Sequence, residues 1–186
     1  MKIFLDLGTH KGEGLLEFFQ LGIIDESYVV HSFEACPDLN SLQEINEKIK
    51  DINNFPKDIN FYNKAVWISD GFIKFNNRRD TASHIEGTGF SYFQNEEEFN
   101  TIEVESIDIS KFIDSLPEDS EIVCKMDIEG SEFEVLRYLL KTGSITRIKK
   151  LFVEFHQNNT ENESVDTVIE LANTIVSKNV ELQLWK

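Results

Sequence analysis

Residues 2–16 read KIFLDLGTHKGEGLL, an apolar run followed by Asp6 and a loop with glycine at positions 8, 12 and 14. This pattern predicts a buried strand, a tight turn and a helix that begins near Glu13. Glycine lets the backbone turn sharply, and it lets a ligand approach bare peptide groups because no Cβ stands in the way. The stretch therefore predicts the opening strand, loop and helix of a doubly wound α/β domain, with a ligand at the loop.

The charges beside this loop indicate which ligand it suits. A phosphate-binding loop carries Lys followed by Ser or Thr, whereas here Asp6 precedes the turn and Glu13 opens the helix. Two carboxylates would repel a triphosphate, but they suit a ligand that carries positive charge and donates hydrogen bonds. S-adenosylmethionine has a sulfonium, an α-ammonium and a ribose diol, so we expect it as the cofactor. The contacts that we expect from this loop come from Asp6, Gly8, Thr9, His10, Gly12 and Glu13.

A second polar group lies one strand–helix unit further along the chain. Residues 28–34, YVVHSFE, form an apolar strand that ends in Glu34 and is followed by Ala35. An acid at the tip of the second strand can accept hydrogen bonds from both ribose hydroxyls of a bound nucleotide. This placement fits NAD as well as S-adenosylmethionine, so it leaves both cofactors open.

The rest of the chain alternates between strand and helix patterns. Residues 72–76 and 102–105 alternate like strands around a polar stretch, which predicts a β/loop insertion at about 72–105. We expect one Rossmann-like α/β domain over residues 1–186, pared down as if excised from a larger protein, with a mostly parallel sheet of about six to seven strands. The further strands are predicted at 59–67, 122–128, 150–155 and 180–185, and the further helices at 38–49, 109–116, 131–142 and 164–176.

Composition limits the class of partner. The chain has 34 acidic residues against 18 Lys and Arg, a net charge of -16, so its average field repels polyanions and we expect no nucleic acid substrate. We see no basic leader and no apolar run of membrane-spanning length, and we expect a cytoplasmic protein without a membrane partner. Cys36 and Cys124 are isolated in the sequence and are expected to be buried and reduced.

Five segments, in order along the chain, resemble the FkbM family of class I S-adenosylmethionine-dependent methyltransferases. The specific signature is KMDIEGSEFEVL at 125–136, and LFVEFH at 151–156 is similar to the strand that follows it. LDLGTHKGEG at 5–14, SFEACP at 32–37 and IEVESIDISKFI at 102–113 match the first loop, the ribose strand and the segment before the signature. The resemblance implies a Rossmann-like methyltransferase fold and S-adenosylmethionine as cofactor, with Ala65 and Val66 flanking the adenine.

Methyl transfer to a hydroxyl also needs a group that takes the acceptor's proton. A general base or a divalent metal can supply this help. Polar side chains expected at the ends of neighbouring strands are the catalytic candidates: Asp127, Glu129, Glu154 and His156. His156 suits the role of base because its ordinary pKa lies near neutrality, Asp127 could also contact the cofactor, and Asp127 with Glu154 could hold a hard metal ion.

The polar stretch inside the insertion supplies the candidates for acceptor binding, namely Arg78, Arg79, His84 and Tyr92. We expect an O-methyltransferase acting on a hydroxyl of a sugar or glycan, or of another small molecule. One alternative is an NAD-dependent sugar-nucleotide enzyme, which the wide G-x-x-x-G-x-G spacing and the lack of a Tyr-x-x-x-Lys pair disfavour. The other is a non-catalytic nucleotide-binding module.

Overall fold

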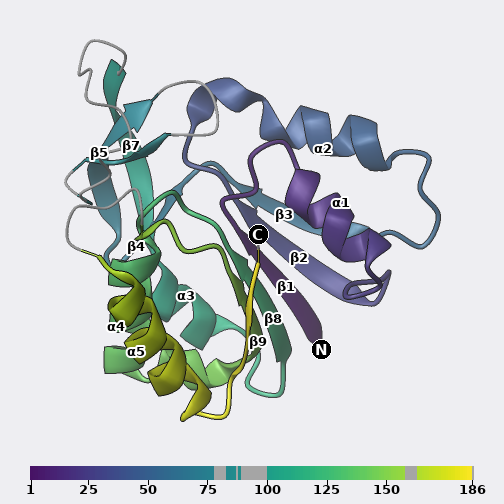
Figure 1. Ribbon diagram of the computed structural model, residues 1–186. Coiled ribbons are helices and arrows are strands. Elements are labelled where there is room, and N and C mark those ends of the chain that lie inside the picture. Colours follow the sequence, from purple (N-terminus) through teal and green to yellow (C-terminus); the bar gives the residue numbers. More distant parts are fainter. Residues whose placement is uncertain (78–82, 87, 89–99, 158–162, 186) are drawn as a thin grey trace.

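A computed structural model of the chain describes residues 1–77, 83–86, 88, 100–157 and 163–185 (Figure 1). Its centre is a parallel sheet of six strands in the order β10-β9-β8-β1-β2-β3. The strand order places β1 between β2 and β8, so the chain changes direction across the sheet at β1, and a ligand is expected at the carboxyl ends of these strands. The strands are β1 (Lys2–Leu7), β2 (Tyr28–Phe33), β3 (Asp58–Tyr62), β8 (Glu121–Met126), β9 (Ile148–Val153) and β10 (Glu181–Leu184).

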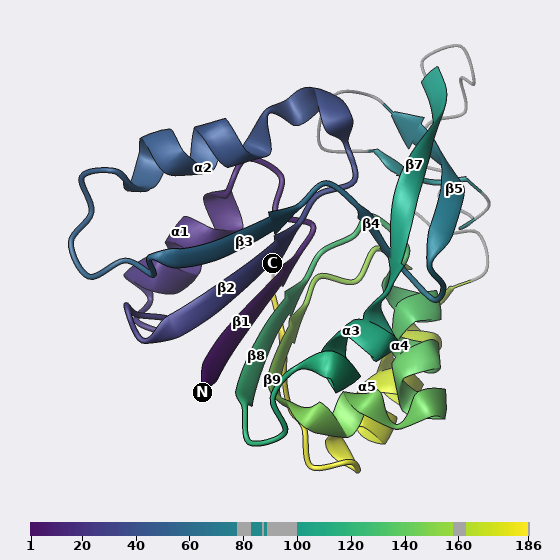
Figure 2. The same cartoon turned by 180° about the vertical axis from the view of Figure 1, so that it is seen from behind.

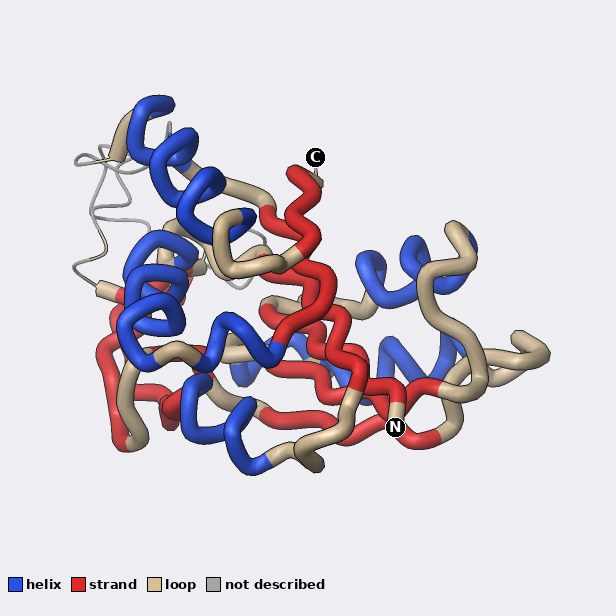
Figure 3. Tube along the Cα trace, turned by 90° about the horizontal axis from the view of Figure 1, so that it is seen from below, coloured by secondary structure: helices blue, strands red, loops and turns tan. Residues whose placement is uncertain are grey.

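Helices cover both faces of this sheet (Figures 1 and 3). Alternate residues of β1 point to opposite faces: Phe4 packs in one core with the side chains of α1 and α2, and Leu5 packs in another with those of α3, α4 and α5. The fold is therefore a doubly wound, Rossmann-like α/β fold, as the sequence predicts. The helices are α1 (Glu13–Gln20), α2 (Ser41–Ile49), α3 (Ile109–Ser115), α4 (Glu132–Thr142) and α5 (Val165–Val176), with short 3-10 turns η1 (Pro37–Leu39) and η3 (Ser144–Arg147).

A second, smaller sheet confirms the expected insertion (Figure 2). It has four strands in the order β4-β7-β5-β6, with β5 and β7 antiparallel to each other. The strand predicted at 59–67 is in fact two strands, because the chain leaves β3 at Asn63 and Lys64 and joins the second sheet as β4. The strands are β4 (Ala65–Trp67), β5 (Gly71–Asn77), β6 (His84–Ile85) and β7 (Asn100–Asp108).

Sequence rules for helix capping predict Asp38 as the N-cap of α2 and a capping box of Ser131 and Glu134 at the start of α4, and the structure differs at both places. Asp38 does not cap α2, because it lies in η1 and accepts a hydrogen bond from Asn77, while Asn40 precedes α2 in the left-handed conformation. Ser131 and Glu134 do not form a capping box on α4, since the Ser131 side chain makes no capping hydrogen bond. Gly143 does end α4, with a φ of 89°.

The helical spacing of apolar residues predicts that Val165, Ile169, Ile175 and Val176 of α5 all face the sheet. Leu171 and Ile175 are buried, but Val165, Ile169 and Val176 are largely exposed, so only one stripe of the helix meets the core. Cys36 and Cys124 are buried free thiols, as expected. Among the described residues, no helix combines the length and the apolar character needed to cross a bilayer.

We predict that Gly8→Ala strongly destabilises the fold, whereas Gly22→Ala is a mild change. Both glycines have positive φ, +79° and +68°, but an added Cβ at Gly8 would lie 1.7 Å from the backbone oxygen of Asp127, and one at Gly22 would meet nothing within 4 Å. The backbone strain alone costs about 1–2 kcal/mol, and the clash at Gly8 should raise the loss to at least ~4 kcal/mol. Urea denaturation of both variants measures the difference, and equal losses would contradict the close approach of β8 to the loop.

Candidate functional site

A cavity of about 390 Å³ opens at the carboxyl ends of β1, β2 and β8. It brings together ten of the residues that the sequence predicts for the site, from four separate segments of the chain. Apolar side chains from η1 and the second sheet complete the wall, including Leu39, Phe75 and Ile85. The predicted residues that line the cavity are Gly8, Thr9, His10, Glu13, Glu34, Ala35, Ala65, Val66, Asp127 and Glu129.

The glycine loop is tied to the sheet beneath it. The backbone amides of Gly8 and Thr9 donate to the carbonyl of Phe33 at 3.0 and 2.9 Å, so the loop folds over the end of β2. Asp6 and Gly12, both expected as cofactor contacts, do not line the cavity. Asp6 is fully buried and accepts a hydrogen bond from the Thr9 hydroxyl, and a Cβ on Gly12 would lie 2.5 Å from the side chain of Ile45. Asp6 and Gly12 therefore support the conformation of the loop through contacts with the protein interior and not through contact with a ligand.

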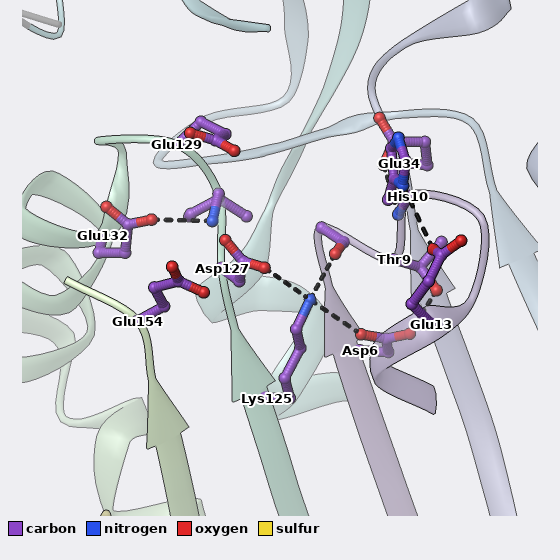
Figure 4. A network of polar contacts seen from close by, with 12 residues as sticks. Asp6, Thr9, His10, Glu13, Glu34, Lys125, Asp127, Glu129, Glu132 and Glu154 are labelled. Carbon is purple, nitrogen blue, oxygen red and sulfur yellow. Dashed lines mark hydrogen bonds and ion pairs between the residues drawn. The ribbon is translucent and has the colours of Figure 1, made fainter. Parts of the chain in front are cut away.

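Lys125 is a site residue that the sequence reasoning missed. Its side chain is 2% exposed, and its Nζ lies 3.5 Å from Asp6 Oδ1 and 3.3 Å from Asp127 Oδ2 (Figure 4). The same ammonium donates to the carbonyl of Gly8. Burial lowers the pKa of Lys125, but the charges of Asp6 and Asp127 outweigh burial and raise it, so the ammonium remains protonated. The signal for this residue was a lysine inside the otherwise apolar strand sequence IVCKM.

Glu34 stands at the tip of β2, where the sequence places it. Its two oxygens accept hydrogen bonds from the backbone amides of His10 and Cys36, each at 2.8 Å. Burial raises the pKa of Glu34 above its ordinary value, and the two amide hydrogen bonds oppose this rise. Each carboxylate oxygen has a second lone pair, so the group can still accept hydrogen bonds from a ligand in the cavity.

Glu13 is the second carboxylate on the wall of the cavity. It accepts a hydrogen bond from Lys48 at 2.7 Å and one from the backbone amide of Lys11 at 3.1 Å, and it lies 3.2 Å from His10 Nδ1. Burial alone would raise the pKa of Glu13, but these contacts, led by Lys48, lower it to about 2. The carboxylate therefore stays ionised at neutral pH and contributes negative charge to the cavity.

His156 gathers the acids at the ends of β8 and β9 into an acid–histidine cluster, defined by His156, Asp127, Glu129, Glu132 and Glu154. Its Nδ1 lies 3.0 Å from Glu132 Oε1. Its Nε2 lies 3.5 Å from Glu129, 3.9 Å from Asp127 and 3.9 Å from Glu154. Asp127 and Glu129 line the cavity, so the cluster forms one of its borders.

The charges of the acid–histidine cluster change the protonation of its members. Burial lowers the pKa of His156, but the hydrogen bond and charge of Glu132, with the charges of Glu129 and Asp127, raise it to about 9. Burial, together with the other acids, raises the pKa of Glu129 to about 8. At neutral pH His156 is thus mainly an imidazolium, which disfavours the role of proton acceptor that its ordinary pKa suggested.

Glu132 holds the turn that presents this cluster, and it is a second site residue that was not predicted from the sequence. Its carboxylate is fully buried and accepts hydrogen bonds from the backbone amides of Ile128 and Gly130, at 2.8 and 2.9 Å. Glu129, between these two residues, has a φ of 50°, a conformation that non-glycine residues rarely adopt. The turn therefore depends on a carboxylate that also binds His156.

The expected acceptor residues are only partly within the described structure. His84 lies in β6, is 5% exposed and contacts Asn76 within the second sheet, while its neighbours Ser83 and Ile85 line the cavity. His84 itself does not line the cavity. Arg78, Arg79 and Tyr92 lie outside the described residues.

We predict that Lys125→Met destabilises the protein far more than Lys150→Met. Lys125→Met leaves Asp6, which is fully buried, without its cation, and breaking a buried ion pair from one side costs about 3–5 kcal/mol. Lys150 on β9 pairs with the exposed Glu181, and such a surface pair contributes about 0–1 kcal/mol. Denaturant unfolding gives both values. Adding Asp6→Asn to Lys125→Met should recover part of the loss, and no recovery would contradict the pairing.

Comparisons with known proteins agree with this geometry. A family model described as the methyltransferase FkbM domain matches residues 6–176. Among solved structures, the crystal structure of the methyltransferase FkbM from Methylobacillus flagellatus KT matches with a TM-score of 0.57 and 18% sequence identity, which shows a shared fold. That match covers 95% of this chain but 38% of the other, so the chain spans well under half the length of its structural relative. No curated protein matches the sequence. Because the family model covers most of its length, this chain belongs to the FkbM methyltransferase domain family.

Proposed function

We propose that this chain transfers the methyl group of S-adenosylmethionine to a hydroxyl group of a sugar or glycan. The observation that carries the proposal is the composition of the cavity: two carboxylates, Glu13 and Glu34, on one side, apolar walls between them and the second sheet, and Asp127 on the far side. This composition fits a cofactor with a cationic centre, a ribose diol and a flat apolar base. Membership of the methyltransferase FkbM domain family supports the same reading.

The chemistry of the cavity wall fits each part of the cofactor. Glu34 is fixed by two backbone amides and has lone pairs left for the ribose hydroxyls. Ala65 and Val66 are the first two residues of β4 and line the cavity with Phe75 and Ile85, and together they offer an apolar slot for the adenine. Glu13 and Asp127 supply the negative charge that the ammonium and the sulfonium need.

When bound, the cofactor supplies a methyl group that its sulfonium has already activated. The remaining task for the chain is to hold the acceptor hydroxyl in line with that methyl group and to accept the hydroxyl proton. The acid–histidine cluster borders the cavity and is the group that we propose for this task. Asp127 is the member best placed to take the proton, because it lines the cavity while Lys125 and His156 flank it with positive charge.

We propose the chemical class of the acceptor from the net charge of the chain. A net charge of -16 disfavours phosphate-rich acceptors such as RNA or DNA, whereas a neutral glycan meets no such repulsion.

A cytoplasmic location without a membrane partner is part of the same proposal. Two free thiols, Cys36 and Cys124, are consistent with a reducing compartment.

We predict that Glu34→Gln weakens S-adenosylmethionine binding roughly ten- to hundredfold. The change keeps the size of the side chain but removes the charge, and a hydrogen bond to a charged group contributes about 1.5–3 kcal/mol. Calorimetry on the folded variant measures the affinity, with Glu26→Gln, an exposed acid, as the matched control. A wild-type protein that binds NAD in preference to S-adenosylmethionine would favour the alternative function, an NAD-dependent sugar-nucleotide enzyme.

We also predict that His156→Ala lowers the rate of methyl transfer at least ~100-fold while cofactor affinity changes little, a usual scale for loss of proton-transfer assistance. The rate should fall because His156 contacts Asp127 and Glu129, which belong to the cluster proposed to take the acceptor's proton. Cofactor affinity should change little because His156 does not itself line the cavity. Formation of S-adenosylhomocysteine with neutral oligosaccharides gives the rate, and calorimetry gives the affinity. Methylation of an oligonucleotide would overturn the glycan assignment, and the lack of turnover with any acceptor would favour a non-catalytic module.

A further inference from the structure

The acid–histidine cluster concentrates carboxylates at one border of the cavity. Four carboxylates lie within 3.9 Å of the imidazole of His156. The ammonium of Lys125 pairs with Asp127 of these acids and also with Asp6. An arrangement of this kind attracts a small cation, because each carboxylate loses part of its solvation at the edge of the cavity.

Three donor atoms of the cluster have the spacing of ligands around one ion. One ligand atom each from Asp127, Glu129 and His156 can be chosen so that all three lie within 4.8 Å of one another. Ligands bound at about 2.1–2.3 Å stand roughly 3.0–4.6 Å apart across an octahedral ion. The three groups therefore need only a small closing movement to share a cation, which displaces the proton from Nε2 of His156 as it binds.

Contacts behind the three donors already fix their directions. Glu132 binds Nδ1 of His156, so Nε2 is the nitrogen on the side of Asp127 and Glu129. A carboxylate on the second ring nitrogen is the usual arrangement behind a metal-binding histidine. Lys125 lies 3.3 Å from Oδ2 of Asp127, and Oδ1 is the oxygen nearer the imidazole. The same Glu132 carboxylate holds the backbone turn that carries Glu129.

Ser131 gives an independent sign of a ligand at this border of the cavity. The residue is 1% exposed, and its hydroxyl has no hydrogen-bond partner among the described residues. It lines the same cavity as Asp127 and Glu129. A buried hydroxyl without a partner costs free energy, so a bound group, such as a water on a cation, would relieve that cost.

We propose that Asp127, Glu129 and His156 bind one first-row divalent cation, of which Mn²⁺ is the best representative. Two carboxylates favour a hard ion, and an imidazole favours a transition metal over Mg²⁺ or Ca²⁺, so Mn²⁺ suits both donor types. The sequence suggested Asp127 with Glu154, but Glu154 is not one of the three donors and lies 3.9 Å from the imidazole.

The role of the ion rests on the proposed function, although its binding does not. A cation beside Asp127 and Glu129 would stand at the border of the cavity where the acceptor hydroxyl is expected. There it would coordinate the hydroxyl oxygen and lower its pKa, so that the proton leaves to a neighbouring carboxylate as the oxygen takes the methyl group. No oxidation or reduction is involved.

Titration of the metal-free protein with Mn²⁺ tests the site, with free Mn²⁺ followed by electron paramagnetic resonance. We expect saturable binding of one ion per chain. Asp127→Asn, Glu129→Gln and His156→Gln should each weaken it at least ~10-fold. Glu134→Gln, an exposed acid on the same helix as Glu132, is the matched control and should leave it unchanged. Circular dichroism shows which variants are folded, and Glu129, on a partly exposed turn, is the variant least prone to misfold.

Two outcomes would overturn the metal site: no saturable binding by the wild type at millimolar Mn²⁺, or the same affinity in every folded ligand variant. Calorimetry with S-adenosylmethionine on the same metal-free protein separates this proposal from the previous one. Cofactor binding and methyl transfer that persist under chelator would retain the methyltransferase and reject the metal. Mn²⁺ binding without any methyl transfer would retain the ion site and reject the proposed activity.

Discussion

The buried ammonium of Lys125 is the interaction on which the arrangement of the site depends. It connects Asp6 at the end of β1, the carbonyl of Gly8 in the loop and Asp127 after β8, so one side chain fixes three backbone segments that meet at the cavity. The segments belong to adjacent parallel strands, whose pairing already brings Asp6 beside Lys125. A buried lysine is costly unless its charge is balanced, and this cost makes any arrangement that separates the three segments unfavourable.

The order of elements could be predicted because it depends on local pattern. Apolar runs bounded by glycine and acidic residues predict all six strands of the main sheet, and Gly143 predicts the end of α4. The break at Asn63 and Lys64 could not be predicted, because residues 59–67 form one apolar-rich run and the division arises from pairing with β7, which is about forty residues later in the sequence. Asp38 and Ser131 satisfy the sequence rules for helix capping, but tertiary contacts determine the actual ends.

The site was predictable to the extent that it follows strand ends. Glu34 and Asp127 line the cavity because parallel strands deliver their carboxyl ends to one edge of a sheet. What the sequence could not supply is the balance of charge among neighbours. The pKa of His156 is raised by Glu132, Glu129 and Asp127, which all come from the segment after β8, and only the folded chain brings their charges to the histidine. Lys125 was overlooked for the same reason, since two of its partners, Asp6 and the carbonyl of Gly8, lie more than a hundred residues away.

The wall of the cavity is made by two parts of the fold, the six-stranded sheet and the second, smaller sheet. Glu34 and Asp127 lie at the carboxyl ends of strands of the six-stranded sheet, whereas Phe75, Ser83 and Ile85 come from an insertion with its own hydrogen-bonded pairing. The insertion enters through β4 and returns through β7 next to it, so its two ends are anchored side by side. Its outer strands can therefore gain or lose residues during evolution while the ion pairs of Lys125 stay intact. One methyl-donor platform could in this way serve many acceptors within a lineage.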